Sequence, residues 1–406
     1  MAESNLTHYD VIVVGAGMVG AACVCLLGRI GDKLPSSHLK IALIESRPLQ
    51  PFNPSRFDPR VAALTEKTRG LLEHCDIWES IEVNRVCPYT AMRVWDAEGT
   101  GRINFDCRDV HQPNLGHIVE ASAITTALMA HIEQLPNVDL FCPAVIENYQ
   151  MQESGVILDL DNGSEIAGNL IVAADGANSS VRDQFQFATR EWDYRQQAIV
   201  TTITTEQSNQ QTAWQRFMHT GPLALLPLND NEGRHHCSIV WSQDTKEADR
   251  LMALSDADFC QQLSVASEYC LGQVTGVDKR FLIPLIQRHA IDYVKPRVAL
   301  IGDAAHSIHP LAGQGVNLGF ADAQVLAKEI NRAFSRGIDV GDLSVLNRYQ
   351  RQRKPENLAA MAAMEGFKRL FGSSNPALRL VRNKGMSGVD QMTPLKNHLI
   401  KTAMAL

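Results

Sequence analysis

The sequence lacks the long apolar run that a membrane-spanning helix requires. No window approaches the ~20 consecutive apolar residues that cross a bilayer. Residues 1–10 are polar and lack the basic stretch and apolar run of a signal peptide. We therefore expect a cytoplasmic protein whose contact with a membrane is at most peripheral.

Clustered positive charge and metal-binding spacings are also missing. The chain carries 38 Lys and Arg residues against 45 Asp and Glu residues, and this balance disfavours binding to a phosphate backbone. Its nine cysteines are scattered, without a Cys-x-x-Cys pair or histidines at zinc-finger spacing. We expect reduced cysteines, no metal site and no nucleic-acid partner.

Apolar material is sufficient for more than one core. Hydrophobic residues make up 45% of the chain and charged residues 20%, which is typical of globular proteins. At 406 residues the chain exceeds the roughly 100–200 residues of one domain. The length leaves room for a cofactor domain and a substrate domain.

The succession of patterns predicts an α/β fold. A β-branched run at 9–14 ends at glycine, helical spacing covers 15–28, and a second strand is expected at 40–45, which together make a βαβ unit. Further helices are expected at 61–73, at 121–134, from Gly315 onward, and over 345–406 with a break at 372–376; further strands are expected within 92–105, at 138–141, 155–160, 169–174 and 298–301, and within 199–241.

The first glycine motif follows the first strand and reads Gly15-Ala16-Gly17-Met18-Val19-Gly20. Its glycines permit a tight turn, a close approach of the backbone to a diphosphate, and close packing of helix on strand. The phosphates would lie at the helix N-terminus, where free N–H groups favour an anion. Glu45, at the end of the next strand, is the expected acceptor for a ribose hydroxyl. A chance glycine turn is the alternative, and the order of strand, helix and acidic strand end favours the dinucleotide site.

Two further motifs follow apolar strands. Asp175 begins the first of these, at 175–182, which also fits an ordinary strand-to-helix turn capped by Ser and Asn. The other contains Gly302 and Asp303 and continues through Pro310, Gly313, Gln314, Gly315, Val316 and Asn317. An Asp at a strand end can accept from a ribitol hydroxyl, and glycines before a helix expose N–H groups suited to a flavin edge. A second phosphate loop or a simple turn is the alternative.

In this order and spacing, the three motifs resemble those of the class A flavoprotein monooxygenases, which have the para-hydroxybenzoate hydroxylase fold. The resemblance covers nearly the whole chain and implies FAD as cofactor and NAD(P)H as co-substrate. It implies that Gly15, Gly17, Met18, Gly20 and Glu45 hold the ADP half, that Asp175 holds the middle, and that Gly302, Asp303, Pro310, Gly313, Gln314, Gly315, Val316 and Asn317 hold the flavin end. Arg60 matches the family arginine beside the cofactor, whereas a lone loop arginine would simply be solvated.

The resemblance also implies a domain arrangement. A Rossmann-like FAD-binding domain of the GR2 type would comprise 1–80, 105–185 and 285–345, with an interleaved β-sheet substrate domain at 81–104 and 186–284 and a C-terminal helical segment at 346–406. The tail helix carries a stripe of Met361, Met364, Phe367 and Phe371. We expect this stripe to pack on the protein's own core or an oligomer interface, with contact to lipid or partner subunits as the alternative.

Within the family, segments 115–120, 237–242, 308–320 and 364–377 look most like the ubiquinone-biosynthesis hydroxylases UbiH, UbiF and UbiI, and UbiI (2-polyprenylphenol hydroxylase) above the others. This implies that NAD(P)H reduces FAD, that dioxygen then forms a C4a-hydroperoxyflavin, and that one oxygen passes to C5 of a polyprenylated phenol. The implied setting is a homo-oligomer in a ubiquinone-biosynthesis assembly, peripheral to the inner membrane.

Several alternatives stay open from sequence. These are a UbiF- or UbiH-like hydroxylase of another ring position, a hydroxylase of a small soluble aromatic, an FAD-dependent prenyl reductase, and a scaffold that keeps FAD without turnover. The catalytic residue that would assist phenol deprotonation stays unknown. His306 and His309 lie near the third motif, where a packing or hydrogen-bonding role is favoured.

Overall fold

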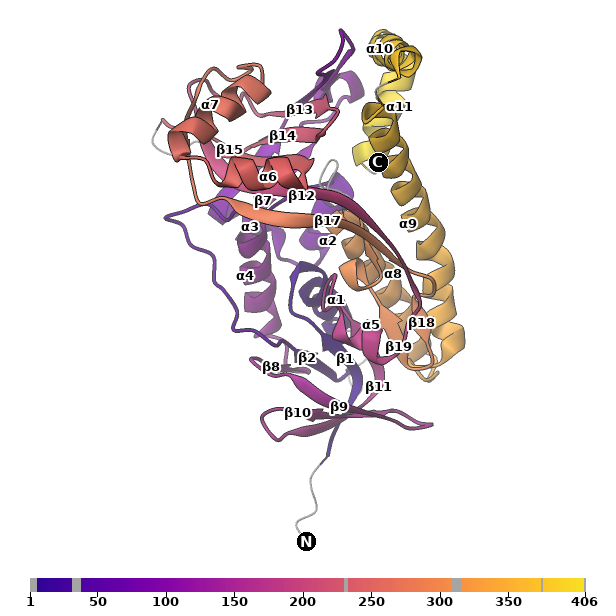
Figure 1. Ribbon diagram of the computed structural model, residues 1–406. Helices are drawn as coiled ribbons and strands as arrows, with labels where there is room; N and C mark the ends of the chain where they lie inside the picture. The colour runs from indigo at the N-terminus through magenta and orange to yellow at the C-terminus, as the bar shows by residue number, and fades with distance from the viewer. Residues whose placement is uncertain (1–5, 31–37, 230–232, 309–314, 374, 405–406) are drawn as a thin grey trace.

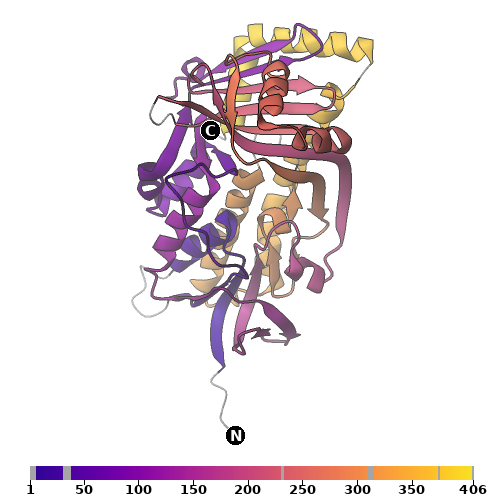
Figure 2. The ribbon, with the colours of Figure 1, turned by 60° about the vertical axis from the view of Figure 1, so that its left-hand side comes forward.

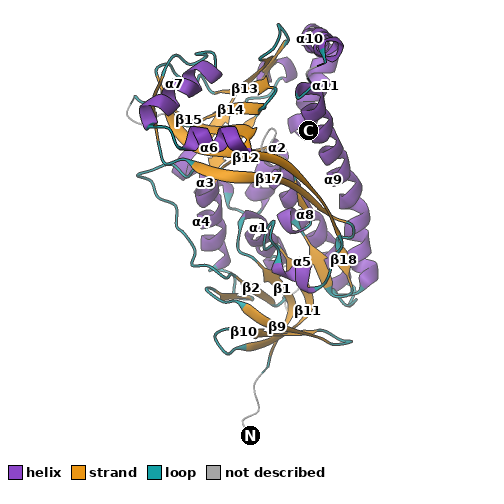
Figure 3. Ribbon diagram, viewed as in Figure 1, coloured by secondary structure: helices purple, strands orange, loops and turns teal. Residues whose placement is uncertain are grey.

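The computed structural model describes residues 6–30, 38–229, 233–308, 315–373 and 375–404. Figure 1 shows two β-sheet regions, one above the other, with a long C-terminal helix beside both. Helices and strands alternate along the chain (Figure 3), so the expected α/β class is confirmed.

The lower sheet is built around a buried parallel core. Strand β1 (Thr7–Val14) pairs in parallel with β2 (Ile41–Ile44) and β11 (Glu165–Ala173), and β11 pairs in parallel with β19 (Val298–Leu300). Their apolar runs are buried on both faces, as parallel strands require. The sheet is completed by β8 (Val138–Phe141), β9 (Ile146–Met151), β10 (Val156–Leu160) and β18 (Val294–Lys295).

Helices cover this sheet, and a small sheet lies beside it. Helix α1 (Met18–Gly28) packs against α4 (Ala121–Ile132) and α8 (Gly315–Phe334). The expected helix over 61–73 is wrong for its first part, because 61–64 forms a strand, β3. The helix begins only at Glu66. The small sheet consists of β3 (Val61–Leu64), β7 (Gly116–Glu120) and β4 (Val86–Tyr89). The other elements of this region are α2 (Glu66–His74), α3 (Trp78–Arg85), α5 (Ser180–Gln184) and the short 3-10 turn η2 (Gly302–Ala304), whereas the 3-10 turn η1 (Cys107–Val110) packs against the last helix of the chain.

The upper sheet is mainly antiparallel. Its long strands β12 (Thr189–Thr205) and β17 (Phe281–Ala290) pair with each other and curve down toward the lower sheet (Figures 1 and 2). Helices α6 (Thr245–Met252) and α7 (Asp256–Ala266) close an apolar core against it. The other strands are β5 (Ala91–Asp96), β6 (Arg102–Asp106), β13 (Thr212–Met218), β14 (Gly221–Pro227), β15 (His235–Asp244), β16 (Val274–Val277) and β20 (His306–Ser307).

The C-terminal segment is helical, as expected, and its helices are α9 (Leu343–Phe371), α10 (Pro376–Gln391) and α11 (Thr393–Met404). Helix α9 packs on α8 and β18, and the ring of Phe371 at its far end stacks on Phe217 of β13 with centroids 3.9 Å apart. Met361 and Phe371 are buried, which confirms core packing for these two residues, whereas Phe367 is 47% exposed. In the described part of the chain, no helix has the length and apolar character needed to cross a bilayer.

Candidate functional site

The three sequence motifs meet because of strand order. Strands β2, β1, β11 and β19 are neighbours and run in parallel, so their carboxyl ends lie at one edge of the sheet. Glu45 follows β2, Gly15 follows β1, Asp175 lies two residues after β11, and Gly302 lies two residues after β19. Ligands of open α/β sheets bind at this edge.

A cavity of about 480 Å³ opens beside these strand ends. One wall contains four of the predicted cofactor residues, Met18, Asp303, Gly315 and Val316. The opposite wall comes from β17 and consists mainly of apolar side chains, namely Ile283, Pro284, Leu285 and Ile286. The sequence patterns did not single out this wall, because its partners are distant in the chain.

The glycine turn before α1 has the shape that a diphosphate requires. Gly15 has φ +102°, and a Cβ there would lie 2.5 Å from the Ala174 carbonyl oxygen. At Gly20 a Cβ would lie 1.9 Å from the Gly15 carbonyl oxygen, whereas at Gly17 no described atom lies within 4 Å. No side chain of the described residues caps α1 at Gly17. The first-turn amides are thus available to an anion.

Two carboxylates flank this turn. Glu45 Oε2 accepts a bond from the amide of Ala16 at 2.8 Å, and Oε1 accepts from the amide of Arg47 at 2.9 Å. Asp175 Oδ2 accepts from the amide of Val181 at 3.2 Å, while its buried Oδ1 has no hydrogen-bond partner among the described residues. A buried acceptor without a partner is costly unless a ligand supplies the donor, so Asp175 Oδ1 fits a cofactor hydroxyl or amide.

Asp303 opens onto the cleft. The surrounding protein raises the pKa of Asp303 by desolvation, and the charges of His306 and Arg60 oppose this shift. Arg60 lines an adjoining cavity of about 550 Å³ together with Asp58 and Lys279. Asp58 fixes the backbone here, accepting from the amide of Arg60 at 2.8 Å. The structure therefore brings Arg60 and Asp303 into one electrostatic environment.

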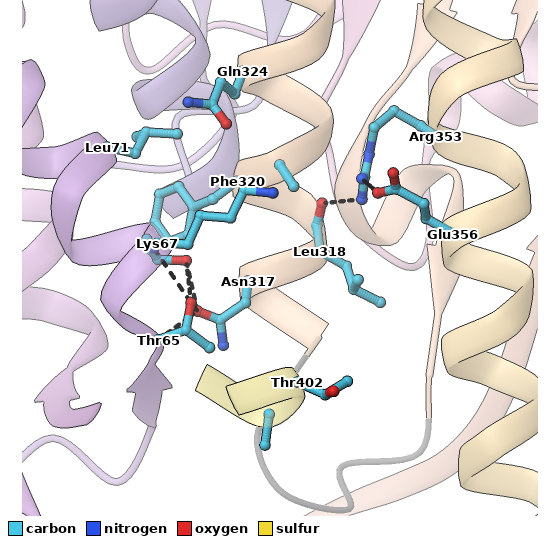
Figure 4. Close-up of a pocket in the computed structure, with 13 residues that line it drawn as sticks. Thr65, Lys67, Leu71, Asn317, Leu318, Phe320, Gln324, Arg353, Glu356 and Thr402 are labelled. Atoms are coloured by element: carbon cyan, nitrogen blue, oxygen red, sulfur yellow. Dashed lines mark hydrogen bonds and ion pairs between the residues drawn. The ribbon is translucent and has the colours of Figure 1, made fainter. Parts of the chain in front are cut away.

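Asn317 is held by the protein itself. Its Oδ1 accepts from the Thr68 hydroxyl at 2.7 Å and from the Thr65 amide at 3.1 Å, and its Nδ2 donates to the Ala63 carbonyl at 2.8 Å. Figure 4 shows Asn317 turned toward Thr65 at one side of a pocket of about 180 Å³. The side chain thus joins α8 to β3 and α2. Because the side chain makes these bonds, the backbone of Asn317 is the part that would contact a cofactor. Pro310, Gly313, Gln314 and His309 lie outside the described residues.

An arginine that the sequence did not single out fixes the loop before Arg60. Arg85 Nε lies 2.8 Å from Glu120 Oε1, and its guanidinium covers the rings of Phe52 and Phe57 at 4.9 and 4.4 Å from their centroids. The amide of Asp58 donates to Glu120 Oε2 at 2.6 Å. The sequence gives no signal for these contacts of Arg85, because Arg85 resembles any polar residue at a helix end.

His306 is buried, and its imidazole Nε2 contacts a carboxylate, so this nitrogen is not free to act as a base in the cleft. Its Nε2 lies 2.5 Å from Asp322 Oδ2, and both side chains are buried. The expected hydrogen-bonding role of His306 is confirmed.

These features fit a bound flavin dinucleotide. The open amides of α1, Glu45 and the unpartnered Asp175 Oδ1 suit the diphosphate and sugar portions, and the cleft between Asp303 and β17 offers an apolar wall to an aromatic ring system. Most reactive atoms in such a site belong to the cofactor, while the protein binds, orients and excludes water.

Comparison with known proteins gives matches over the whole chain. The model of the FAD binding domain family matches residues 8–364. The chain is 34% identical to the mitochondrial ubiquinone biosynthesis monooxygenase COQ6 of Xenopus tropicalis, covering 97% of this chain and 93% of the relative. It is 33% identical to the 3-demethoxyubiquinol 3-hydroxylase of Escherichia coli K12, covering 98% of each. Among solved structures, p-nitrophenol 4-monooxygenase PnpA from Pseudomonas putida DLL-E4 has the same fold, with a TM-score of 0.78, 19% identity, and coverage of 98% of this chain and 99% of that one.

Proposed function

The chain belongs to the family of FAD-dependent monooxygenases that includes the ubiquinone-biosynthesis hydroxylases, and on this premise we propose that it hydroxylates a polyprenylated phenol at C5 in a UbiI-like reaction. The observation that carries the proposal is the cleft in which Asp303, Gly315 and Val316 face the apolar wall of β17. An electron-rich ring with a prenyl chain would find apolar contact there. The structural likeness to an aromatic hydroxylase is consistent with this use of the fold.

Bound FAD would supply oxygen activation, with electrons from NAD(P)H. The chain's own residues would hold the reactants. In the proposed arrangement Gly15, Gly17, Met18, Gly20 and Glu45 hold the ADP half, Asp175 holds the middle, and Arg60, Gly302, Asp303, Pro310, Gly313, Gln314, Gly315, Val316 and Asn317 hold the flavin end.

The proposed domain division largely follows the two sheets; in the upper sheet, β17 crosses the boundary at 284/285, and β20 lies in the FAD-binding set. The FAD-binding domain comprises 1–80, 105–185 and 285–345, and the substrate domain comprises 81–104 and 186–284. The parallel core strands lie in the first set, and β12 to β15 lie in the second, which supports the division.

A contact with the inner membrane, membership of an assembly and a homo-oligomeric state complete the proposal. Exposed apolar side chains on the last two helices support an apolar contact at this end of the molecule; they are Leu378, Leu380, Val381, Leu395 and Leu399.

Hydroxylation at another ring position is the second candidate. The identity of 33% to a 3-demethoxyubiquinol 3-hydroxylase, over 98% of both chains, favours it. The two candidates predict the same flavin site and differ in the substituents of the substrate ring and in the ring carbon that faces the flavin.

Profiling of quinone intermediates in cells that lack the protein tests the proposal. Accumulation of a prenylphenol without the C5 hydroxyl, restored by the wild-type chain, is the expected result. Accumulation of a demethoxy intermediate would support the second candidate. Normal ubiquinone, with purified protein that still shows a yellow flavin spectrum, would overturn both and direct the search to soluble aromatics.

A further inference from the structure

A buried polar network packs against residues 302–306, which we name the flavin loop because we propose that this segment holds the flavin end of FAD. It consists of His306, Asp322 of α8, and Arg353 and Asn357 of α9, each at most 2% exposed. Burying four polar side chains is costly unless their hydrogen bonds are satisfied; in this network His306 Nδ1 has no partner among the described residues. The sequence motifs did not include Asp322, Arg353 or Asn357.

One carboxylate binds both flanks of Asp303. Asp322 Oδ2 accepts from the amide of Gly302 at 3.1 Å and contacts His306 Nε2 at 2.5 Å. Asp303 lies between these two attachment points and opens onto the cleft. Since Gly302 has φ +58°, the backbone turns sharply just before Asp303. Asp322 therefore anchors the loop on both sides of Asp303.

The other oxygen of the same carboxylate is held by α9. Asp322 Oδ1 accepts from Arg353 Nε at 2.8 Å and from Asn357 Nδ2 at 3.1 Å. Arg353 Nη2 also donates to Asn357 Oδ1 at 2.8 Å, which fixes the amide so that its Nδ2 faces Asp322. Although burial alone would raise it, the charges of His306 and Arg353 and the bonds they make hold the pKa of Asp322 below its usual range. The carboxylate is thus charged and fixed on both oxygens.

Arg353 reaches the first turn of α8 as well. Its Nη2 lies 3.4 Å from the Leu318 carbonyl oxygen, next to Asn317 (Figure 4). A Cβ at Gly319 would lie 2.6 Å from Val19 Cγ2 and 3.2 Å from Gly302 Cα, so α8 packs closely against the loop at Gly302. A shift of Arg353 would therefore move both the loop and the helix start.

Resting on the proposed placement of the flavin at this loop, we propose that Asp322 is a positioning residue for FAD, and that Arg353 and Asn357 couple this positioning to the docking of α9. Asp322 does not contact the cofactor. It acts through the Gly302 amide and His306, which fix Asp303. Loss of its charge should loosen FAD and change the environment of the flavin ring more than it unfolds the protein.

The chain offers a matched control at its other end. Asp96 of β5 is also buried, and it accepts from Arg382 Nε at 2.7 Å and from Asn383 Nδ2 at 2.9 Å. Like Asp322, it binds an arginine and an asparagine of a C-terminal helix. Asp96 is remote from the carboxyl edge of the lower sheet, so its loss should cost stability without affecting FAD.

The test compares Asp322→Asn with Asp96→Asn in the full-length holoprotein. FAD release on serial dilution, followed by flavin fluorescence, gives the dissociation constant, and the visible flavin spectrum and midpoint potential report the ring environment. We expect roughly tenfold or greater weakening of FAD binding for Asp322→Asn, with a shifted spectrum and potential. Asp96→Asn should keep wild-type values for all three while its thermal midpoint falls.

Equal FAD constants and spectra for Asp322→Asn and Asp96→Asn would overturn the inference. If Asp322→Asn does not fold, Asn357→Ala and Arg353→Lys replace it, and wild-type FAD binding by both would overturn the coupling to α9. Because the titration contains no substrate, failure to hydroxylate a prenylphenol would refute the proposed function and leave this inference intact.

Discussion

At the scale of single residues, Asp303 faces two opposing influences. Desolvation disfavours its charge, while His306 and Arg60 favour it. If this carboxylate accepts a cofactor hydroxyl, as we propose, Asp303→Ala should weaken FAD binding by roughly 1.5–3 kcal/mol, the contribution of a hydrogen bond to a charged group. Equilibrium dialysis of the flavin measures the change. Full retention with a normal flavin spectrum would show that Asp303 does not hold the cofactor.

His289 gives a prediction about pH. Burial, together with the charges of His306, Lys354 and Arg190, lowers the pKa of His289 from 6.5 to about 4. The folded protein thus keeps His289 neutral in a range where the unfolded chain protonates it. The stability that His289 contributes is present above pH 6.5 and is lost as the pH falls toward 4, a loss of roughly 2 kcal/mol.

Urea unfolding of wild type and His289→Gln at several pH values between 7 and about 4 would measure this contribution. The variant should show a shallower loss of unfolding free energy than the wild type over that range. Parallel curves would mean that other groups account for the acid sensitivity.

At the scale of elements, the parallel core strands and the glycine motif were predictable because their signals are local. Apolar runs of β-branched residues identify β1 and β19, and the residues after them carry the motifs. Strand β3 was not predictable, because 61–64 has helical spacing and becomes a strand only by pairing with β7, with Val61 opposite Glu120. The network around Asp322 was missed for the same reason, since Arg353 lies 31 residues away and looks like a surface helix residue.

Docking of α10 against the upper sheet includes a buried ion pair. Arg382 Nη2 lies 2.6 Å from Asp96 Oδ2, and each side chain is 1% exposed. Arg382→Ala would leave Asp96 buried without a counter-ion, and we expect a loss of roughly 3–5 kcal/mol of unfolding free energy. Denaturant titration measures it. The exposed pair of Arg108 and Asp106 provides the comparison, and an Arg108→Ala variant as damaging as Arg382→Ala would contradict this account.

At the scale of the whole molecule, the apolar surface of α10 gives a test of the proposed membrane contact. Leu380 and Val381 are 57% and 63% exposed, so replacing both with Lys should leave the thermal midpoint unchanged. Removal of their apolar area should reduce co-sedimentation with zwitterionic phospholipid vesicles several-fold, because such vesicles do not attract the added lysines electrostatically. Val83→Lys, at an exposed side chain of α3, is the matched control. Wild-type sedimentation of the double variant would exclude α10 as the contact.

The pairing of β12 with β17 limits how this molecule could be recombined with its relatives. The two strands pair from Thr189 opposite Ala290 to Val200 opposite Phe281, with an irregularity between Asp193 and Gln197. They form one two-stranded ribbon of the upper sheet that extends toward the lower sheet. A chimera that takes the upper sheet from another hydroxylase with only one of these strands would mix two parental sequences along the whole ribbon. Functional exchange of substrate preference should therefore require both strands to be inherited together, with crossover points placed outside 189–290.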